Sequence, residues 1–455
     1  MREPPVDPVR PLPPPCALEE QAFTGPLSQH RYSAGLIRLF LDGVLRCAAS
    51  QRATAAFLRL IQSWLPGVEA TPCANTGRMW LLRLGLHELT REKERADDWV
   101  WIMDHTLQLG PWKCLVIVGV RLNRWRQNPR PLVHEDLVLL NLTPMDEATG
   151  DWVYQAMCQT VGETGVPREI VSDGGGELQR GLDLLQKDHP EVARVYDVKH
   201  KMALLLKKGL EADPRWETFI TQSNQTKRKV TQTELAFLLP PSLKNKARYM
   251  NLEALVNWGR HVTRYLDEPG NVSAQGVDRS KLEAKLGWLR EYRAALEEWS
   301  QLLDVAEVTN HDIRCSGYRP KARQELAATL LPRITSPTAQ QMRDAALEFV
   351  MQQSEAASGD GERLIGSSEI LESLIGKYKQ LQSTHSKGGM TAMLLSFGAI
   401  VSNKTQTTIC DALRRIRTVD VGRWCRKNLG VTLQAQRLLA FERNKNRIQT
   451  GKLPE

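Results

Sequence analysis

Closely spaced cysteines are missing from this 455-residue sequence. Its eight cysteines stand at positions 16, 47, 73, 114, 158, 315, 410 and 425, and none of them forms a CxxC pair. A structural zinc site or a disulfide framework needs cysteines at short, recurring spacings. The sequence therefore predicts neither, and it suits a reducing compartment.

Long hydrophobic runs are missing as well. No stretch approaches 18 uninterrupted apolar residues, so we expect no transmembrane helix. The first residues, MREPPVDPVRPLPPP, are charged and rich in proline and lack the apolar centre of a secretory signal. Residues 1–30 are predicted to form a disordered leader, and the protein is expected in the cytoplasm.

Basic residues outnumber acidic ones, with 61 Lys and Arg against 52 Asp and Glu, a net charge of +9. The excess is concentrated near the C-terminus, where residues 401–455 hold 12 basic and 4 acidic residues, a net +8. One sign of charge over a whole segment favours a polyanionic partner over a merely solvated surface.

Residues 31–95 show a helical pattern. Apolar residues at spacings of three and four predict one helix from Tyr32 and a second over Ala53–Trp64, closed by Pro66-Gly67. A turn of small residues then leads into a third helix, Arg78–Thr90. This arrangement indicates a DNA-binding helix-turn-helix with Arg78 among its contacts. A plain three-helix bundle is the alternative.

A strand pattern begins at residue 99, where short apolar runs are bounded by turn residues. Three strands, a helix, a strand, a helix and a strand follow one another, which is the order of the RNase H fold. We therefore expect an α/β protein with an RNase H-like mixed five-stranded sheet. The predicted strands are Trp99–Asp104, Cys114–Leu122, Leu137–Leu142, Glu169–Asp173 and Val192–Val198, and the helices are Thr149–Glu163 and Glu177–Lys187.

The strand pattern stops after Lys199, and long polar helices such as Ser280–Val305 and Thr338–Gln353 take its place. They are separated by loops at Pro240-Pro241 and Asp267–Asn271. This pattern predicts an all-helical insertion that interrupts the catalytic fold, whose last helix returns at Ser367–Gln380. The expected divisions are core 96–205, insertion 206–362, core 363–400 with a polar loop at Ser383–Thr391, and a basic helical tail 401–455.

Two aspartates stand where predicted strands end. Asp104 follows the run Trp99–Met103, and Asp173 follows Glu169–Ser172 and precedes three glycines. These strands are neighbours in the RNase H order, so both carboxylates are expected on one pair of metal ions. Two Mg²⁺ ions bound by carboxylates can activate a nucleophile and stabilise the leaving oxygen of a phosphodiester. A helix cap or turn residue is the usual reading of either aspartate alone.

The third acid is a choice between Glu369 and Glu372. The apolar stripe of their helix is Ile370, Leu371, Leu374, Ile375 and Tyr378. At about 100° per residue, Glu369 lies opposite the centre of the stripe and is expected to face water, whereas Glu372 lies at its edge. We prefer Glu372. Lys379 falls on nearly the same bearing and is a candidate phosphate contact.

Asp197 and His200 form a DxxH pair where the fifth strand ends. The histidine is placed to orient a phosphate or to donate to a carboxylate. The alternative is a helix capped by Asp197, with His200 in its first turn.

Together these segments resemble the DDE transposases of bacterial insertion sequences. The resemblance is carried by WVWIMDHT (99–106), REIVSDGGGEL (168–178), YDVKHKMALLLK (196–207) and SSEILESLIGKYKQ (367–380), with TGRMWLLRLGLHELTR (76–91) similar to their DNA-binding start. It spans most of the chain. The Tyr-Arg-Glu-Lys signature of one such group is reduced here to Glu372 and Lys379.

The resemblance implies that Asp104, Asp173 and Glu372 are the catalytic, metal-binding DDE triad. Asp197 and His200 would match the [C/D]xxH element found where a helical insertion interrupts the fold in hAT-like enzymes. Two Mg²⁺ ions are the implied cofactors, with Mn²⁺ as a substitute. The implied partners are double-stranded DNA and a second copy of the chain, in the nucleoid of a bacterium.

Further DNA contacts are expected at aromatic and basic side chains. Trp258, among basic neighbours, is our choice for stacking a flipped base, with a core position as the alternative. Candidate phosphate contacts are Lys227, Arg228, Lys229, Arg414 and Arg415. The sequence predicts a transposase; the rival functions are an RNase H-like nuclease without strand transfer and a non-catalytic DNA-binding protein derived from a transposase.

Overall fold

The computed structural model describes residues 27, 30–65, 68–109, 112–145, 148–242, 252–267, 278–357, 359, 361–383, 390–429, 438 and 441. Most of the predicted leader and of the tail beyond residue 429 lie outside these residues. The same holds for Pro66-Gly67, for most of the loop predicted at Asp267–Asn271 and for most of the loop predicted at Ser383–Thr391. In the part described, no helix is long and apolar enough to cross a membrane.

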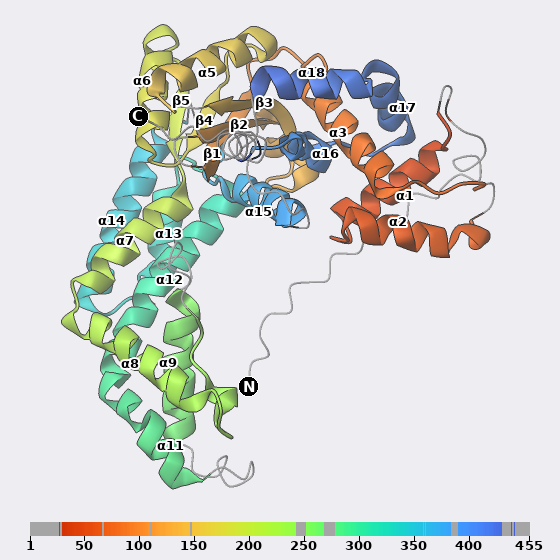
Figure 1. Ribbon diagram of the computed structural model, residues 1–455. Helices are drawn as coiled ribbons and strands as arrows, with labels where there is room; N and C mark the ends of the chain where they lie inside the picture. Colours follow the sequence, from red (N-terminus) through yellow and green to blue (C-terminus); the bar gives the residue numbers. More distant parts are fainter. Residues whose placement is uncertain are drawn as a thin grey trace, which may run out of the picture.

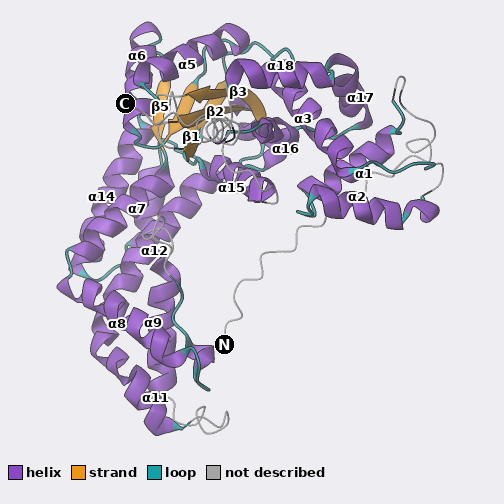
Figure 2. Ribbon diagram, in the orientation of Figure 1, coloured by secondary structure: helices purple, strands orange, loops and turns teal. Residues whose placement is uncertain are grey.

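A mixed five-stranded sheet forms the centre of the upper part of the molecule (Figure 2). Its strand order is β3-β2-β1-β4-β5, in which β1, β2 and β3 are antiparallel neighbours and β4 and β5 run parallel to β1. This topology confirms the predicted RNase H-like sheet. The strands are β1 Trp99–Leu109, β2 Trp112–Arg121, β3 Val138–Met145, β4 Glu169–Ser172 and β5 Ala193–Tyr196.

The first strand is longer than predicted. Its expected end was Asp104, but β1 continues to Leu109 because β2 pairs with it antiparallel beyond that point, with Asp104 opposite Val116. Its pairing with β4, by contrast, ends at Met103 and Ser172. Asp104 therefore lies inside a strand, at the position where one of its two neighbouring strands stops.

Helices cover both faces of the sheet. The face that carries Trp101 and Met103 packs against α5 (Gly150–Thr164) and α6 (Gly176–Asp188) in one hydrophobic core. The opposite face, with Val100 and Ile102, belongs to the larger core. The helices packed on that side include α3 Ala74–Thr90, α15 Glu369–Ser383 and α16 Ser396–Val401.

The helical insertion extends from the sheet as an elongated limb, coloured green to cyan in Figure 1. It begins earlier than the predicted residue 206, because β5 ends at Tyr196 and α7 (Val198–Glu211) already packs on α12 and α14. The predicted helix Ser280–Val305 is divided into shorter ones. The remaining limb helices are α8 Pro214–Val230, η4 Ala236–Leu238, α9 Leu252–Asp267, α11 Arg279–Leu286, η6 Gly287–Tyr292, α12 Arg293–Ser316, α13 Ala322–Leu330 and α14 Pro337–Ser354.

The N-terminal helices share a core with helices near the C-terminus. The helix α3 contacts α16, α17 and α18, and its Gly85 lies so close to the Leu395 carbonyl that a Cβ there would be 1.7 Å from the oxygen. The N-terminal helical region and the helices near the C-terminus, which were predicted to belong to separate divisions of the chain, therefore pack together. The other elements are α1 Ala34–Leu45, α2 Gln51–Leu60, η2 Gln62–Trp64, α4 Leu122–Gln127, η3 His134–Asp136, η7 Ala392–Leu395, α17 Gln406–Arg415 and α18 Thr418–Asn428.

The exposure of α3 changes along its length. From Trp80 to Glu88 nearly every residue is buried, whereas Asn75 near the start of the helix is exposed and Arg78 is half-buried. The N-terminal residues of a recognition helix are the ones that contact base edges, so the helix-turn-helix stays a prediction. The helices that cover α3 include ones from more than 300 residues later in the chain, which the local sequence pattern does not reveal.

Candidate active site

Asp104 and Asp173 lie side by side on the sheet. The parallel register of β1 and β4 ends with Met103 opposite Ser172, so the two aspartates are the next residues of neighbouring strands. Adjacent strands lie about 4.8 Å apart, and alternate residues share a face. Asp104 is two residues after Ile102, and Asp173 is two residues after Val171, so each aspartate shares a face with that apolar residue. Ile102 and Val171 both belong to the larger core. The two carboxyl groups therefore start from the same face.

The environment of Asp104 disfavours its negative charge. Burial and then the charge of Asp173 raise the pKa of Asp104 to about 7, although the His105 backbone N–H donates to Oδ1 at 2.6 Å and opposes the rise. Among the described residues, the ion pairs at this edge are made by Asp197, Glu369 and Glu372 and not by the two strand aspartates. Two neighbouring carboxylates that make no ion pair of their own with the described residues form a site that a metal ion would stabilise.

Asp173 is fixed by the turn that follows β4. Its Oδ1 accepts a hydrogen bond from the Gly175 backbone N–H at 3.0 Å, and its carbonyl accepts one from Gln179 Nε2 at 2.8 Å. Gly174 passes so close to Tyr196 that a Cβ would lie 2.8 Å from the phenol oxygen. The absence of a side chain at Gly174 thus allows the turn between β4 and α6 to pass against Tyr196.

Glu372 reaches the same region from α15. The buried stripe of this helix is Leu371, Leu374, Ile375, Tyr378 and Leu381. Glu372 is half-buried at the edge of the stripe, as its predicted bearing requires, and its charge contributes to the raised pKa of Asp104. Its Oε2 accepts a hydrogen bond from Lys199 Nζ at 2.8 Å, and its Oε1 lies 3.9 Å from His200 Nε2.

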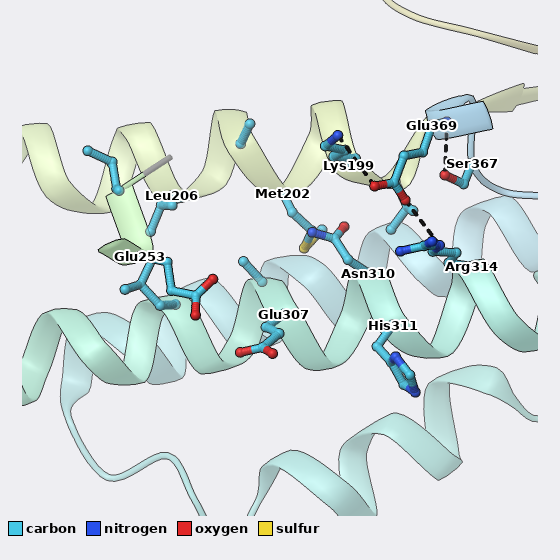
Figure 3. Close-up of a pocket in the computed structure, with 15 residues that line it drawn as sticks. Lys199, Met202, Leu206, Glu253, Glu307, Asn310, His311, Arg314, Ser367 and Glu369 are labelled. Carbon is cyan, nitrogen blue, oxygen red and sulfur yellow. Dashed lines mark hydrogen bonds and ion pairs between the residues drawn. The ribbon is translucent and has the colours of Figure 1, made fainter. Parts of the chain in front are cut away.

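Glu369 faces Arg314 of α12 as well as Lys199. Its Oε2 lies 3.1 Å from Arg314 Nε of α12, and its Oε1 lies 3.8 Å from Lys199 Nζ (Figure 3). The prediction that Glu369 simply faces water was incomplete, because the insertion that supplies Arg314 covers that side of α15. Glu372 is among the charges that raise the pKa of Asp104.

Asp197 and His200 join two distant segments at the start of α7. Asp197 is the N-cap of α7 and accepts from the His200 backbone N–H at 2.9 Å, as the alternative reading proposed. Its second oxygen accepts hydrogen bonds from the backbone N–H of Ser368, at 2.6 Å, and from the Ser368 hydroxyl. Burial alone would raise the pKa of Asp197, but the nearby His200 imidazole together with these hydrogen bonds outweighs it and holds the pKa below its ordinary value.

His200 is oriented toward the acids by the same aspartate. Its Nδ1 lies 3.5 Å from Asp197 Oδ1, close enough for an ion pair but longer than a well-formed hydrogen bond. Asp197 first, and then Glu372 and Asp173, raise the pKa of His200 against the effect of burial. The imidazole is therefore part of the electrostatic network that contains all three predicted acids.

The fit of this site to a metal pair is incomplete in one respect. Within the described part of the chain, no three His, Cys, Asp or Glu side chains gather closely enough to hold one ion. Asp104 and Asp173 offer the hard oxygen ligands that Mg²⁺ prefers, and the charge of Asp173 raises the pKa of Asp104. Glu372 is within electrostatic reach but is engaged by Lys199. The two aspartates fit the ions, and Glu372 would have to exchange its partner.

Trp258, which was predicted to stack a flipped DNA base, is buried in the structure. Only 9% of this residue is exposed, its indole N–H donates to the Leu238 carbonyl at 2.8 Å, and its ring packs among Phe219 and Trp288. It belongs to the core of the limb. The amphipathic helix α9 turns Trp258 inward, whereas Arg264 of the same helix is exposed and Arg260 is half-buried, so basic residues nearby in the sequence do not indicate an exposed tryptophan.

The predicted basic contacts lie on four different helices. Arg78 is half-buried on α3, with a buried Nε that has no hydrogen-bond partner. Lys227 donates to the Ser242 hydroxyl, and Arg228 and Lys229 are exposed near the end of α8. Arg414 and Arg415 are exposed on α17, and Lys379 is exposed on α15, about two turns beyond Glu372.

Lys199 and Ser368 were not predicted as site residues. Lys199 is adjacent to His200 in the sequence, but its partner Glu372 is 173 residues away, and Ser368 is 171 residues from Asp197. Only the repeated small polar pair before α15, Ser367-Ser368, resembles a helix start that a second segment might complete. Pairings across an insertion of this length leave no local signal.

No protein-family model and no curated protein sequence matches this chain. Among solved structures, the chain is similar to one in the Drosophila P element transposase strand transfer complex, with 11% identical residues and a TM-score of 0.41. The similarity covers 85% of this chain and 93% of that chain. At this identity and score, the likeness assigns no role to any residue.

Proposed function

We propose that this protein is a DNA transposase that cleaves strands at the ends of a mobile element and joins them to target DNA. One observation carries the proposal. Asp104 in β1 and Asp173 directly after β4 each follow the last paired residue of these parallel strands in an RNase H-like sheet, and Glu372 contributes to the same electrostatic network from α15. A large helical limb separates β5 from that helix. This is the arrangement that the resemblance to DDE transposases leads us to expect.

The chain would bind two Mg²⁺ ions through Asp104, Asp173 and Glu372. When bound, the ions supply an activated nucleophile and charge stabilisation of the leaving oxygen. Water would be the nucleophile for cleavage and a DNA 3′-hydroxyl for joining. The raised pKa of His200 makes its imidazole positively charged more readily than that of an ordinary histidine. His200 stands beside Glu372, where it would meet a phosphate, and Lys379 extends from α15, the helix that carries Glu372.

Double-stranded DNA is the proposed partner, and two ends require at least two copies of the chain. Arg414 and Arg415 are exposed on α17, and Arg423, Arg426 and Lys427 are exposed on α18. These two helices contact α3, which packs against the sheet, so their charge lies on the same body as the acids. Each phosphate contact would make DNA binding more sensitive to salt.

Metal-dependent processing of DNA that contains both element ends and their flanking sequence tests the proposal. With Mg²⁺ the protein should cut at the ends and join the cut strands to a second duplex. Asp104→Ala and Asp173→Ala should abolish both activities while retaining DNA binding. Cutting without joining would favour the RNase H-like nuclease. DNA binding without either reaction would favour a non-catalytic DNA-binding protein.

A further inference from the structure

Lys199 occupies the position at Glu372 that a metal ion would need. Its ammonium donates to Oε2 of Glu372 at 2.8 Å, and the side chains are 28% and 29% exposed, so both are partly withdrawn from water. A Mg²⁺ ion binds carboxylate oxygens at about 2.0–2.1 Å. An ammonium and a divalent cation sharing one carboxylate repel each other, so Lys199 and a metal ion compete for Glu372.

A second acceptor lies within reach of the same ammonium. Glu369 Oε1 is 3.8 Å from Lys199 Nζ, on the turn of α15 that precedes Glu372. The other oxygen of Glu369 faces Arg314 Nε at 3.1 Å, which fixes the carboxylate from the α12 side. Figure 3 shows Glu369 between the two cations.

A cavity beside Lys199 leaves room for its ammonium to move from Glu372 to Glu369. Lys199, Glu369 and Arg314 line a cavity of about 340 Å³ between α7 and α12. The lysine side chain has a flexible four-carbon stem and a compact charge, so its ammonium can turn from the Glu372 carboxylate to that of Glu369 without movement of α7.

We infer that Lys199 is a positioning residue that holds Glu372 in the metal-free protein and transfers to Glu369 when a divalent cation binds. The inference rests on the proposed function, since it takes Glu372 as a metal ligand. In this account Glu369 is not a metal ligand but the resting place of the displaced ammonium. Arg314 keeps that place available by holding Glu369 away from the acids.

Binding of Mn²⁺ alone to the full-length protein without DNA, followed by electron paramagnetic resonance, tests the inference. Lys199→Met removes the competing charge and should tighten Mn²⁺ binding about fivefold, the effect expected for loss of one partly exposed ion pair. Glu369→Gln should weaken binding severalfold, because the displaced lysine loses its acceptor. In the Lys199→Met background, Glu369→Gln should have no effect, and this non-additivity is what a purely structural role would not produce.

Lys201→Met is the matched control, because Lys201 lies on the same helix but faces the Phe349 ring at 5.3 Å. It should leave Mn²⁺ affinity unchanged. Lys199→Gln, which keeps polarity and removes charge, should behave like Lys199→Met. If Asp104→Asn binds Mn²⁺ as wild type does, the metal site and the proposed function fail. If Asp104→Asn loses Mn²⁺ but neither Lys199 variant binds it more tightly, only the role of Lys199 is overturned.

Discussion

Asp197 and Ser368 are hydrogen-bonded across the whole insertion. The Asp197 carboxylate caps α7, where the limb departs, and also accepts from the backbone N–H of Ser368 at 2.6 Å, where the limb returns. Beside them, the Val198 backbone N–H donates to the Gly366 carbonyl at 2.9 Å. These bonds set the start of α15 against the start of α7. The position of Glu372 therefore depends on a residue that need not touch metal or DNA.

Loss of the Asp197 carboxylate should loosen this junction. Asp197→Ala leaves the Ser368 N–H and the first turn of α7 without an acceptor, and we expect it to lower the free energy of unfolding by about 3–5 kcal/mol. Ser368→Ala removes only the hydroxyl donor and should cost about 1 kcal/mol. Urea unfolding measures both. Equal, small losses in the two variants would contradict the role of Asp197 as the shared acceptor.

The metal-free protein should lose stability as pH rises toward neutrality. The pKa of Asp104 rises from 3.8 to about 7 on folding, so the folded state binds this proton more tightly. Its contribution favours folding most below pH 4, declines between pH 4 and 7, and is constant above. Asp104→Asn should flatten that decline in melting curves recorded with a chelator. An unchanged slope in Asp104→Asn would show that Asp104 ionises normally.

Substitutions of Glu372 and of Glu369 should have different effects on the rate of strand cleavage. Glu372→Gln removes a proposed metal ligand and should slow strand cleavage more than about a hundredfold, beyond the usual effect of losing an outer contact to a metal ligand. Glu369→Gln, the matched variant one turn away, should reduce cleavage no more than about tenfold at saturating Mg²⁺. Single-turnover cleavage rates compare them. The reverse ranking would make Glu369 the third acid.

Trp258 should matter for folding rather than for DNA. Trp258→Ala leaves a cavity among Phe219, Trp288 and the Leu238 carbonyl, and we expect a loss of about 3–5 kcal/mol in the free energy of unfolding. Trp258→Phe keeps most of the packing and should bind DNA with unchanged affinity. Reduced DNA affinity in a stable Trp258→Phe protein would restore the stacking role.

Some parts of this structure could be predicted from local patterns. The apolar runs predicted all five strands, the RNase H fold that their succession indicates predicted which of them are neighbours, and the helical bearing of Glu372 put it at the edge of its buried stripe. The end of β1 could not be predicted, because strand β2, and not the apolar run, determines it. The burial of α3 and the contacts of Lys199 and Glu369 depend on segments hundreds of residues away, which no local pattern encodes.

Sulfur substitution in the DNA tests whether the acids bring a metal ion to the scissile phosphate. The DNA substrate carries a phosphorothioate at the cleaved bond, and single-turnover cleavage is measured in Mg²⁺ and in Mn²⁺. Sulfur is a poor ligand for Mg²⁺ and a better one for Mn²⁺. We predict slow cleavage in Mg²⁺ that Mn²⁺ restores, and no restoration in Asp104→Asn. Cleavage at the same rate in both metals, or without any divalent cation, would contradict the account.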